Sequence, residues 1–342
     1  MQTETVHLIA GQTCITNSPG KTAIMRVFVK YPLRCYTLEA LARETGLPAA
    51  VVVENILELT EQGVRIGYRE PQGYFYEPKE EHLDPDGIAS RLDTQWWGKR
   101  IWAGEELTST IDIAKALHGR KSLHGMVIVA NRQTQGRGRF GNTWVSPKGK
   151  NILLTFLIEH SEWEPPVSLL SLYAATAAAR VLDTAYGVPI SLKWPNDLMV
   201  QGKKLGGVLV EWNKSHKRLL ISLGLNVHSV PSDWPSELRE TTVSLAMVQK
   251  QEWQREELIA QCGTTWETLW ETTMHDHGET VKGYWKQYYD MVGKTVSLTV
   301  RGMELLAYAK TIDDAGRLVV TGQDGAEYAL LPEEVQKLRV ME

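Results

Sequence analysis

Two arginines held between glycines form the first segment that could bind an anion. The segment Gly136–Gly141 reads Gly-Arg-Gly-Arg-Phe-Gly. Glycines let the backbone approach a ligand, and guanidinium groups donate paired hydrogen bonds to phosphate or carboxylate oxygens. The spacing also satisfies the G-x-G-x-x-G pattern of dinucleotide-binding folds, but that pattern requires a helix directly after the glycines. Because Asn142–Pro147 leads instead into a glycine and a strand, we predict a mobile arginine clamp; a solvated turn is the alternative.

A second polar segment, Lys193–Asp197, reads Lys-Trp-Pro-Asn-Asp. Its proline ends the preceding strand and leaves an amide and a carboxylate at the strand end, where active groups are common. A lysine, an amide and a carboxylate this close together can bind phosphate and Mg²⁺; a β-turn is the alternative. Lys203 and Lys204 then lead into a strand through a glycine pair, which leaves room for a ligand against the backbone. The alternative is that both lysines are solvent-exposed residues at the start of the strand.

The elements that must position these segments follow an α+β pattern. One long helix is expected over 167–186 among many strands, so strands and helices do not alternate regularly. A second helical region, rich in Trp, Glu and Leu, is expected over 252–287. The expected strands, rich in Val, Ile and Leu, are 126–130, 151–158, 190–194, 205–211 and 219–227.

The first part of the chain is expected to be a small helical unit that ends in a β-hairpin. Gly46 breaks the chain before the third helix, and Pro48 suits the first turn of that helix. Helix, helix, tight turn, helix and hairpin is the order of a winged helix-turn-helix. The expected elements are helices over 23–31, 38–44 and 48–62, two strands within 64–76 with their turn at 71–73, and a candidate boundary in the polar segment 78–87.

The last part of the chain changes to short strands separated by turn residues. Evenly spaced short strands in so few residues suggest a small β-barrel. The strands are expected over 293–300, 305–312, 318–320 and 327–331, with turns at Gly302, 314–316 and 324–325.

Composition limits the class of protein further. With 342 residues the chain can form two or three domains. It has no run of 18 apolar residues and no secretion signal, so we expect a cytoplasmic protein that does not contact a membrane. Cys14, Cys35 and Cys262 are widely spaced and suit free thiols, and no zinc-binding spacing is present. A net charge of -4 argues against broad coating of nucleic acid but permits a local basic groove.

Taken together, the polar segments resemble the biotin–protein ligase family, whose motifs occur here in the same order and approximate spacing. The flanking units resemble the layout of the bifunctional BirA-type ligase/repressors. The resemblance implies a winged helix-turn-helix over 1–82, a mixed-sheet, class II synthetase-like ligase domain over 83–287 and an SH3-like β-barrel over 288–342. The matching motifs are Ser109-Thr110, Gln133, Gly136–Arg139, Trp144, Ser146-Pro147, Lys193–Asp197, Lys204–Gly207, Glu211 and Gly224–Asn226.

The resemblance implies an ATP-dependent enzyme that forms biotinyl-5′-AMP and transfers biotin to a lysine of a carboxylase's biotin carrier domain. ATP, Mg²⁺ and biotin are the expected ligands, no tightly bound metal is expected, and a homodimer is a family expectation. The implied biotin contacts are Ser109, Thr110, Ile111, Gln133, Arg137, Gly138, Arg139, Lys204, Gly207, Ser222 and Gly224. The implied ATP or adenylate contacts are Arg137, Arg139, Trp144, Lys193, Asn196 and Asn226. The implied catalytic residues are Arg139, Lys193, Asp197 and Lys204, with Asp197 also a Mg²⁺ ligand.

Three departures from the family pattern bear on this site. Ile111 stands where Asn usually follows Ser-Thr, so one polar contact is missing or supplied by Asp112. Ser222 stands where glycine is common, and Asn142 and Thr143 replace a more basic pair seen in some members. None of these removes a core motif, so activity is still expected.

The charge of the third expected helix bears on whether the first unit binds DNA. The third helix carries Glu54, Glu58 and Glu61 and no Lys or Arg, which is unfavourable beside DNA phosphates. Operator binding controlled by biotinyl-adenylate, with Arg43, Arg65 and Arg69 on the DNA backbone, and a winged helix that has lost DNA binding both remain open. For the whole chain, the alternatives are a lipoate-type ligase and a ligand sensor that acts only as a DNA-binding regulator.

Overall fold

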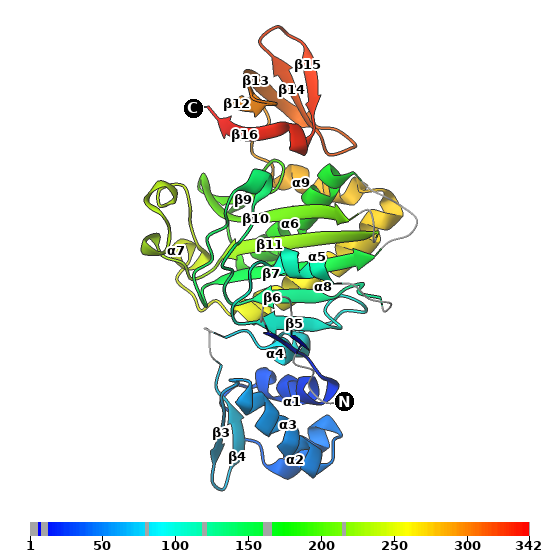
Figure 1. Cartoon of the computed structure of the whole chain (residues 1–342), viewed down its shortest axis with the longest axis vertical. Helices are drawn as coiled ribbons and strands as arrows, with labels where there is room; N and C mark the ends of the chain where they lie inside the picture. The colour runs from blue at the N-terminus through cyan, green and yellow to red at the C-terminus, as the bar shows by residue number, and fades with distance from the viewer. Residues whose placement is uncertain are drawn as a thin grey trace.

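The computed structural model describes residues 6–7, 13–78, 82–117, 122–159, 166–213 and 217–341. Three parts follow one another along the long axis of the molecule: the helices α1–α3, a central sheet with its helices, and a C-terminal sheet (Figure 1). Within the described residues, no helix is both long and apolar enough to span a membrane.

The central sheet has nine strands in the described residues, and its neighbouring strands are antiparallel except for β5 and β6. Apolar residues are buried against each of its two faces. Alternate residues of the central strand β7 enter two separate cores, Leu154 and Phe156 on one side and Leu153 and Leu157 on the other. In spatial order the strands are β1 (Val6–His7), β2 (Thr13–Thr16), β5 (Ile101–Gly104), β6 (Val127–Ala130), β7 (Asn151–Glu159), β11 (Arg218–Asn226), β10 (Lys203–Asn213), β9 (Asp197–Val200) and β8 (Ile190–Lys193).

Helices cover the two faces of this sheet unequally. The long helices α6 (Val167–Tyr186), α8 (Arg255–Asp276) and α9 (Glu279–Tyr288) pack on one face, and the short helix α5 (Thr110–Ala116) packs on the other. The short helix α7 (Leu245–Val248) and two 3-10 turns, Pro231–Asp233 and Ser236–Leu238, lie between β11 and α8 in the chain.

The α+β pattern expected from the sequence is confirmed, and α6 has the expected bounds. The five expected strands all form, each within a few residues of its expected limits. The strands β1, β2, β5 and β9 were not expected, because they lie outside the runs rich in Val, Ile and Leu from which the strands were predicted. Since β2 pairs with β5, residues 13–16 belong to the central sheet rather than to the helical unit expected over 1–82.

The N-terminal unit contains the expected three helices and hairpin around its own apolar core. The Ser18 side chain caps α1 by accepting a hydrogen bond from Lys21 N–H, and Thr37 caps α2 in the same way. Gly46 ends α2 in the left-handed conformation, at φ 70°. The elements are α1 (Pro19–Lys30), α2 (Leu38–Thr45), α3 (Ala49–Glu61), β3 (Ile66–Arg69) and β4 (Gly73–Tyr76).

Helix α4 (Pro85–Ser90) joins this unit to the central part by packing on α1 and α8. Lys21 of α1 and Asp86 of α4 are completely buried, with 3.4 Å between Nζ and Oδ2. Glu256 of α8 accepts a hydrogen bond from the backbone N–H of Asp84 at 2.9 Å. The second half of the polar segment 78–87, which was expected to mark a boundary, is therefore a buried junction that carries ionisable side chains.

The buried carboxyl group of Asp84 gives this junction an expected pH dependence. Burial raises its pKa well above the usual value, and the nearby Glu256 and Asp86 carboxylates raise it further. A raised pKa means that the folded state holds the proton more tightly than the unfolded state, so this contribution to stability is lost as the pH rises through the raised pKa. The asparagine of Asp84→Asn is neutral at every pH, so its contribution to stability does not change with pH. The melting temperature of the variant minus that of the wild type should therefore increase as the pH is raised from 5 to 9. A difference that stays constant across this range would contradict the prediction.

The C-terminal strands form a second sheet whose core is continuous with that of the central part. The Trp194 indole N–H of the central part donates to the Gly316 carbonyl at 3.0 Å across this contact. Strand β16 was not expected, because its apolar residues Val335, Leu338 and Val340 do not alternate regularly with polar residues. The antiparallel order is β15 (Glu327–Leu330), β14 (Leu318–Gly322), β13 (Met303–Ile312), β12 (Thr295–Val300) and β16 (Val335–Val340).

Candidate ligand-binding site

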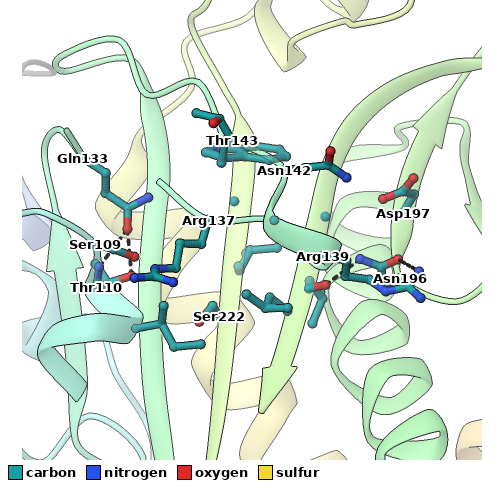
Figure 2. Close-up of a pocket in the computed structure, with 18 of the residues that line it drawn as sticks. Ser109, Thr110, Gln133, Arg137, Arg139, Asn142, Thr143, Asn196, Asp197 and Ser222 are labelled. Carbon is teal, nitrogen blue, oxygen red and sulfur yellow. Dashed lines mark hydrogen bonds between the residues drawn. The ribbon is translucent and has the colours of Figure 1, made fainter. Parts of the chain in front are cut away.

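A cavity of about 200 Å³ lies on the α5 face of the central sheet. Residues of β10 and β11, the start of α5 and the segment 133–144 surround it (Figure 2). The lining residues are Ser109, Thr110, Ile111, Gln133, Arg137, Gly138, Arg139, Phe140, Asn142, Thr143, Trp144, Leu154, Asn196, Asp197, Lys204, Gly207, Val208, Leu209, Ser222, Leu223, Gly224 and Gln336.

The residues singled out from the sequence as biotin contacts all line this cavity. So do Trp144, Asn196 and Asp197, whereas Lys193 lies in an adjoining pocket. Asn226 does not line either pocket: it is buried, and its Nδ2 donates to the Val243 carbonyl at 3.2 Å. Its side chain is bonded to Asn151 of β7 and to the Val243 carbonyl. This placement does not favour the nucleotide contact expected for it.

Neutral hydrogen-bonding groups gather at one end of the cavity. Gln133 Oε1 accepts from the Thr110 backbone N–H at 2.7 Å and from the Thr110 hydroxyl at 3.1 Å (Figure 2). The Thr155 hydroxyl lies 2.8 Å from the hydroxyls of both Thr110 and Ser222. Sequence reasoning missed Thr155 because a lone threonine in an apolar strand carries no motif. This end suits a ligand group that exchanges hydrogen bonds without carrying charge.

The other end of the cavity carries a lysine and a carboxylate. Lys204 Nζ lies 2.5 Å from Asp197 Oδ1 and 5.7 Å from the ring centroid of Trp144. The Trp144 ring lies against Gly224, so closely that a Cβ atom added there would be 2.5 Å from the ring. In the described part of the chain, the Trp144 indole N–H has no hydrogen-bond acceptor, which leaves a donor beside the cavity.

The two arginines of the glycine-rich segment are anchored differently. Arg137 Nε donates to Asp112 Oδ2 of α5 at 2.8 Å. Arg139 Nη1 lies 3.4 Å from Asn196 Oδ1, and its Nη2 donates to the Pro332 carbonyl of the C-terminal part. Burial lowers the pKa of Arg139, which nevertheless remains charged at neutral pH. Only a 3-10 turn, Arg139–Gly141, follows the first glycines, so the long helix of a dinucleotide-binding fold is absent from this described segment.

A second pocket, of about 300 Å³, adjoins the cavity where the central and C-terminal parts meet. Lys193 and Arg139 line it from the central part, and Lys337 and Arg339 of β16 line it from the other side. Burial lowers the pKa of Lys193, while the charge of Asp197 opposes that shift. Sequence reasoning missed the β16 residues because they lie more than 100 positions from the motifs they face. The pocket's excess of positive charge suits a polyanion.

The remaining expected contacts lie on the N-terminal unit. Arg65 forms an exposed ion pair with Glu77, with 3.7 Å between Nη1 and Oε2. The Arg69 guanidinium lies 5.0 Å from the ring centroid of Phe75, and Arg43 is exposed on α2. Across the described residues, no group of three or more His, Cys, Asp or Glu side chains could hold a metal ion.

Comparisons with known proteins point to one family. Residues 103–228 match the Biotin/lipoate A/B protein ligase family. The chain is 28% identical over 284 residues to the bifunctional ligase/repressor BirA of Bacillus subtilis (strain 168), which covers 82% of this chain and 87% of that protein. It is 32% identical over 127 residues to the biotin–[acetyl-CoA-carboxylase] ligase of Mycobacterium tuberculosis, covering 35% of this chain and 46% of that protein. Among solved structures, the biotin protein ligase of Aquifex aeolicus in complex with biotin and ATP superposes with a TM-score of 0.63 at 25% identity, over 70% of this chain and 99% of that one.

Proposed function

We propose that this chain, which carries a domain of the biotin/lipoate A/B protein ligase family over residues 103–228, is an ATP-dependent biotin–protein ligase. The observation that carries the proposal is the polarity of the cavity. Neutral donors and acceptors around Thr110 and Gln133 lie at one end, and the cations Lys204 and Arg139 lie at the other. Biotin has the same arrangement, with a cyclic urea at one end and a carboxylate at the other.

The reaction has two steps that need no covalent enzyme intermediate. A carboxylate oxygen of biotin attacks the α-phosphorus of ATP, and pyrophosphate leaves with the electrons of the broken P–O bond. A neutral lysine amine of the acceptor then attacks the acyl carbon of the adenylate, loses its proton and releases AMP. Lys204 neutralises charge at the acyl-phosphate oxygens, and the Arg139 segment excludes water from the reactive anhydride.

The adjoining pocket suits the phosphates of ATP that leave as pyrophosphate. Lys193, Lys337 and Arg339 supply positive charge there. Mg²⁺ is usually held in proteins by one or two carboxylates together with substrate phosphates. Asp197 would fit that role together with ATP phosphates and water, and the metal would neutralise phosphate charge. This assignment is compatible with the lack of a metal cluster of protein side chains alone in the described residues.

The test of the function is transfer of biotin to a carrier domain. Purified chain with biotin, ATP, Mg²⁺ and the biotin carrier domain of a carboxylase should biotinylate one lysine and release AMP and pyrophosphate in equal amounts. Lipoate in place of biotin should give no transfer, because its dithiolane ring makes no use of the neutral donors and acceptors. Preferential transfer of lipoate, or no transfer to a competent carrier, would overturn the proposal.

Gly224 offers a steric test of the cavity wall. The Cβ of a Gly224→Ala variant would meet the Trp144 ring at 2.5 Å, so the ring must move. Overpacking of this kind lowers the free energy of unfolding by ~1–3 kcal/mol. Because the displaced ring would lose its contact with the nucleotide, the KM for ATP should rise about tenfold. Gly283→Ala is the control, because a Cβ there has no neighbour within 4 Å. Steady-state kinetics that show the same KM for both variants would contradict the proposed contact between Trp144 and the nucleotide.

We further propose that the flanking parts are a winged helix-turn-helix and an SH3-like barrel, with the catalytic domain between them over 83–287. The three helices and hairpin of the first part and the five antiparallel strands of the last support these assignments. A carboxylase carrier domain is the proposed acceptor, and a homodimer is the proposed assembly. Size-exclusion chromatography with light scattering, with and without biotin and ATP, tests the assembly.

Repression is the second candidate function, and the observation that favours it is the match to ligase/repressors along most of the chain. The exposed face of α3 opposes it, since Glu54 and Glu61 are exposed there and α3 has no basic residue. Arg43, Arg65 and Arg69 remain the proposed DNA contacts. A gel shift with the DNA upstream of the chain's own coding region, with and without biotin and ATP, should show ligand-dependent binding. If no binding is seen, repression is rejected and the ligase function remains as the proposal.

A further inference from the structure

A chain of hydrogen bonds runs across the neutral end of the cavity, from Ser222 through Thr155 and Thr110 to Gln133. The Thr155 hydroxyl oxygen lies 2.8 Å from that of Ser222 and 2.8 Å from that of Thr110. The Thr110 hydroxyl lies 3.1 Å from Gln133 Oε1. Thr155 of β7 stands directly opposite Ser222 of β11 in the antiparallel register, and its side chain is completely buried. Ser222 lines the cavity, whereas Thr155 does not.

The direction of every bond in this chain follows from counting protons. The Thr110 backbone N–H can only donate, so the atom that it meets at 2.7 Å must be the amide oxygen of Gln133. The Thr110 hydroxyl also meets this oxygen and therefore donates to it. Thr110 has then used its single proton, so Thr155 donates to Thr110. Thr155 has used its own proton in turn, which leaves Ser222 as the donor to Thr155.

We propose that Ser222 is a ligand-contacting residue that accepts a hydrogen bond from an N–H of the ligand's cyclic urea, and that Thr155 is the positioning residue that enforces this polarity. The Ser222 proton is committed to Thr155, so only the lone pairs of Ser222 Oγ face the cavity. A hydroxyl fixed in this way binds an N–H and rejects an acceptor. The inference rests on the proposed function and deepens it, because a glycine at position 222 would have no side chain to make this contact.

The consequence for ligand choice is a requirement for a donor at this end. A cyclic urea supplies an N–H, whereas an analogue methylated on both ring nitrogens places a methyl group against an acceptor. Ser222 is half-buried in the empty cavity, and once a ligand covers it, an acceptor without a partner loses the hydrogen bond that it made with water. The dimethylated urea should therefore bind far more weakly than biotin to the wild-type chain.

Thr155→Val tests the positioning role because valine keeps the shape of threonine and removes its hydroxyl. Ser222 then loses the acceptor for its proton and can turn that proton toward the ligand's N–H. Isothermal titration of the full chain with biotin should show ~3- to 10-fold weaker binding, the range expected for one neutral hydrogen bond. The KM for ATP and the kcat at saturating biotin should change less than twofold. Thr155→Ser should restore the affinity for biotin.

Thr176→Val is the matched control for burial and for the Thr-to-Val change. Thr176 is fully buried in α6, and its hydroxyl has no hydrogen-bond partner in the described part of the chain. The biotin affinity of this variant should equal that of the wild type. The double variant Thr155→Val with Ser222→Ala should bind no more weakly than Ser222→Ala alone, since both changes act on one contact.

The outcomes separate this inference from the proposed function. If the wild-type chain does not bind biotin, the proposed function fails. If the wild type binds biotin and Thr155→Val binds it equally well, the Ser222–Thr155 inference fails while the ligase proposal stands. Equal loss of biotin and ATP binding in Thr155→Val would indicate a disturbed sheet and would also overturn the positioning role.

Discussion

Lys204→Met should lower the rate of adenylate formation by about 10²–10³-fold, the usual loss when one preorganised electrostatic donor is removed from a reacting centre. The ammonium group lies at the cavity wall within 2.5 Å of the Asp197 carboxylate. In the empty cavity that carboxylate balances its charge. When the biotin carboxylate attacks the α-phosphate, negative charge from both substrates concentrates at this point, and methionine keeps the length of the side chain without the charge. Biotin-dependent exchange of pyrophosphate into ATP measures this step alone.

Lys203→Met is the matched control for Lys204→Met. The two lysines are neighbours on β10, so their side chains point to opposite faces of the sheet, and only Lys204 lines the cavity. The control should keep the exchange rate within a factor of about two. Because Asp197 loses its partner in Lys204→Met, thermal melting should accompany the kinetics. A folded Lys204→Met variant with a normal exchange rate would remove Lys204 from the chemistry.

The parts of the site that could be predicted from the sequence are those whose chemistry is local in the chain. The Gly136–Arg139 segment and the Lys193–Asp197 segment each carry several polar groups on a few consecutive residues, so their types and spacing already indicate an anion site. Strand β7 and helix α6 were also predictable, because long apolar patterns define them. The two segments meet at one cavity because the sheet order β7, β11, β10, β9 places β7, which follows the first segment, near β9, which begins in the second.

The parts that could not be predicted depend on contacts between distant residues. Thr155 acquires a role only because the register of β7 and β11 places it opposite Ser222. Lys337 and Arg339 reach the second pocket because the C-terminal sheet packs against the central part. Asp86 belongs to a polar segment that was expected to mark a boundary, and its burial depends on Lys21, which is supplied by another helix. In each case the sequence contains the residue but no local signal of its partner.

Arg139→Ala should separate formation of the adenylate from its retention. The side chain ties the glycine-rich segment to the rest of the molecule through Asn196 and the carbonyl groups of Pro332 and Val335. Without these bonds the segment should open more often while Lys204 remains in place to assist the first step. Each hydrogen bond of a charged group contributes ~1.5–3 kcal/mol, so release of the adenylate should become about 10- to 100-fold faster. Released adenylate would label lysines on a bystander protein such as serum albumin, which can be measured by streptavidin blotting.

Arg132→Ala provides the comparison, because Arg132 lies just before the same segment but forms an exposed ion pair with Glu106, with 2.9 Å between Nη1 and Oε2. An exposed pair of this kind contributes little, so bystander labelling by this variant should match the wild type. Faster release in Arg139→Ala with unchanged pyrophosphate exchange would place the arginine in retention of the intermediate. If exchange instead falls as far as in Lys204→Met, Arg139 acts in the first step, and the closed segment is needed to form the adenylate as well as to keep it.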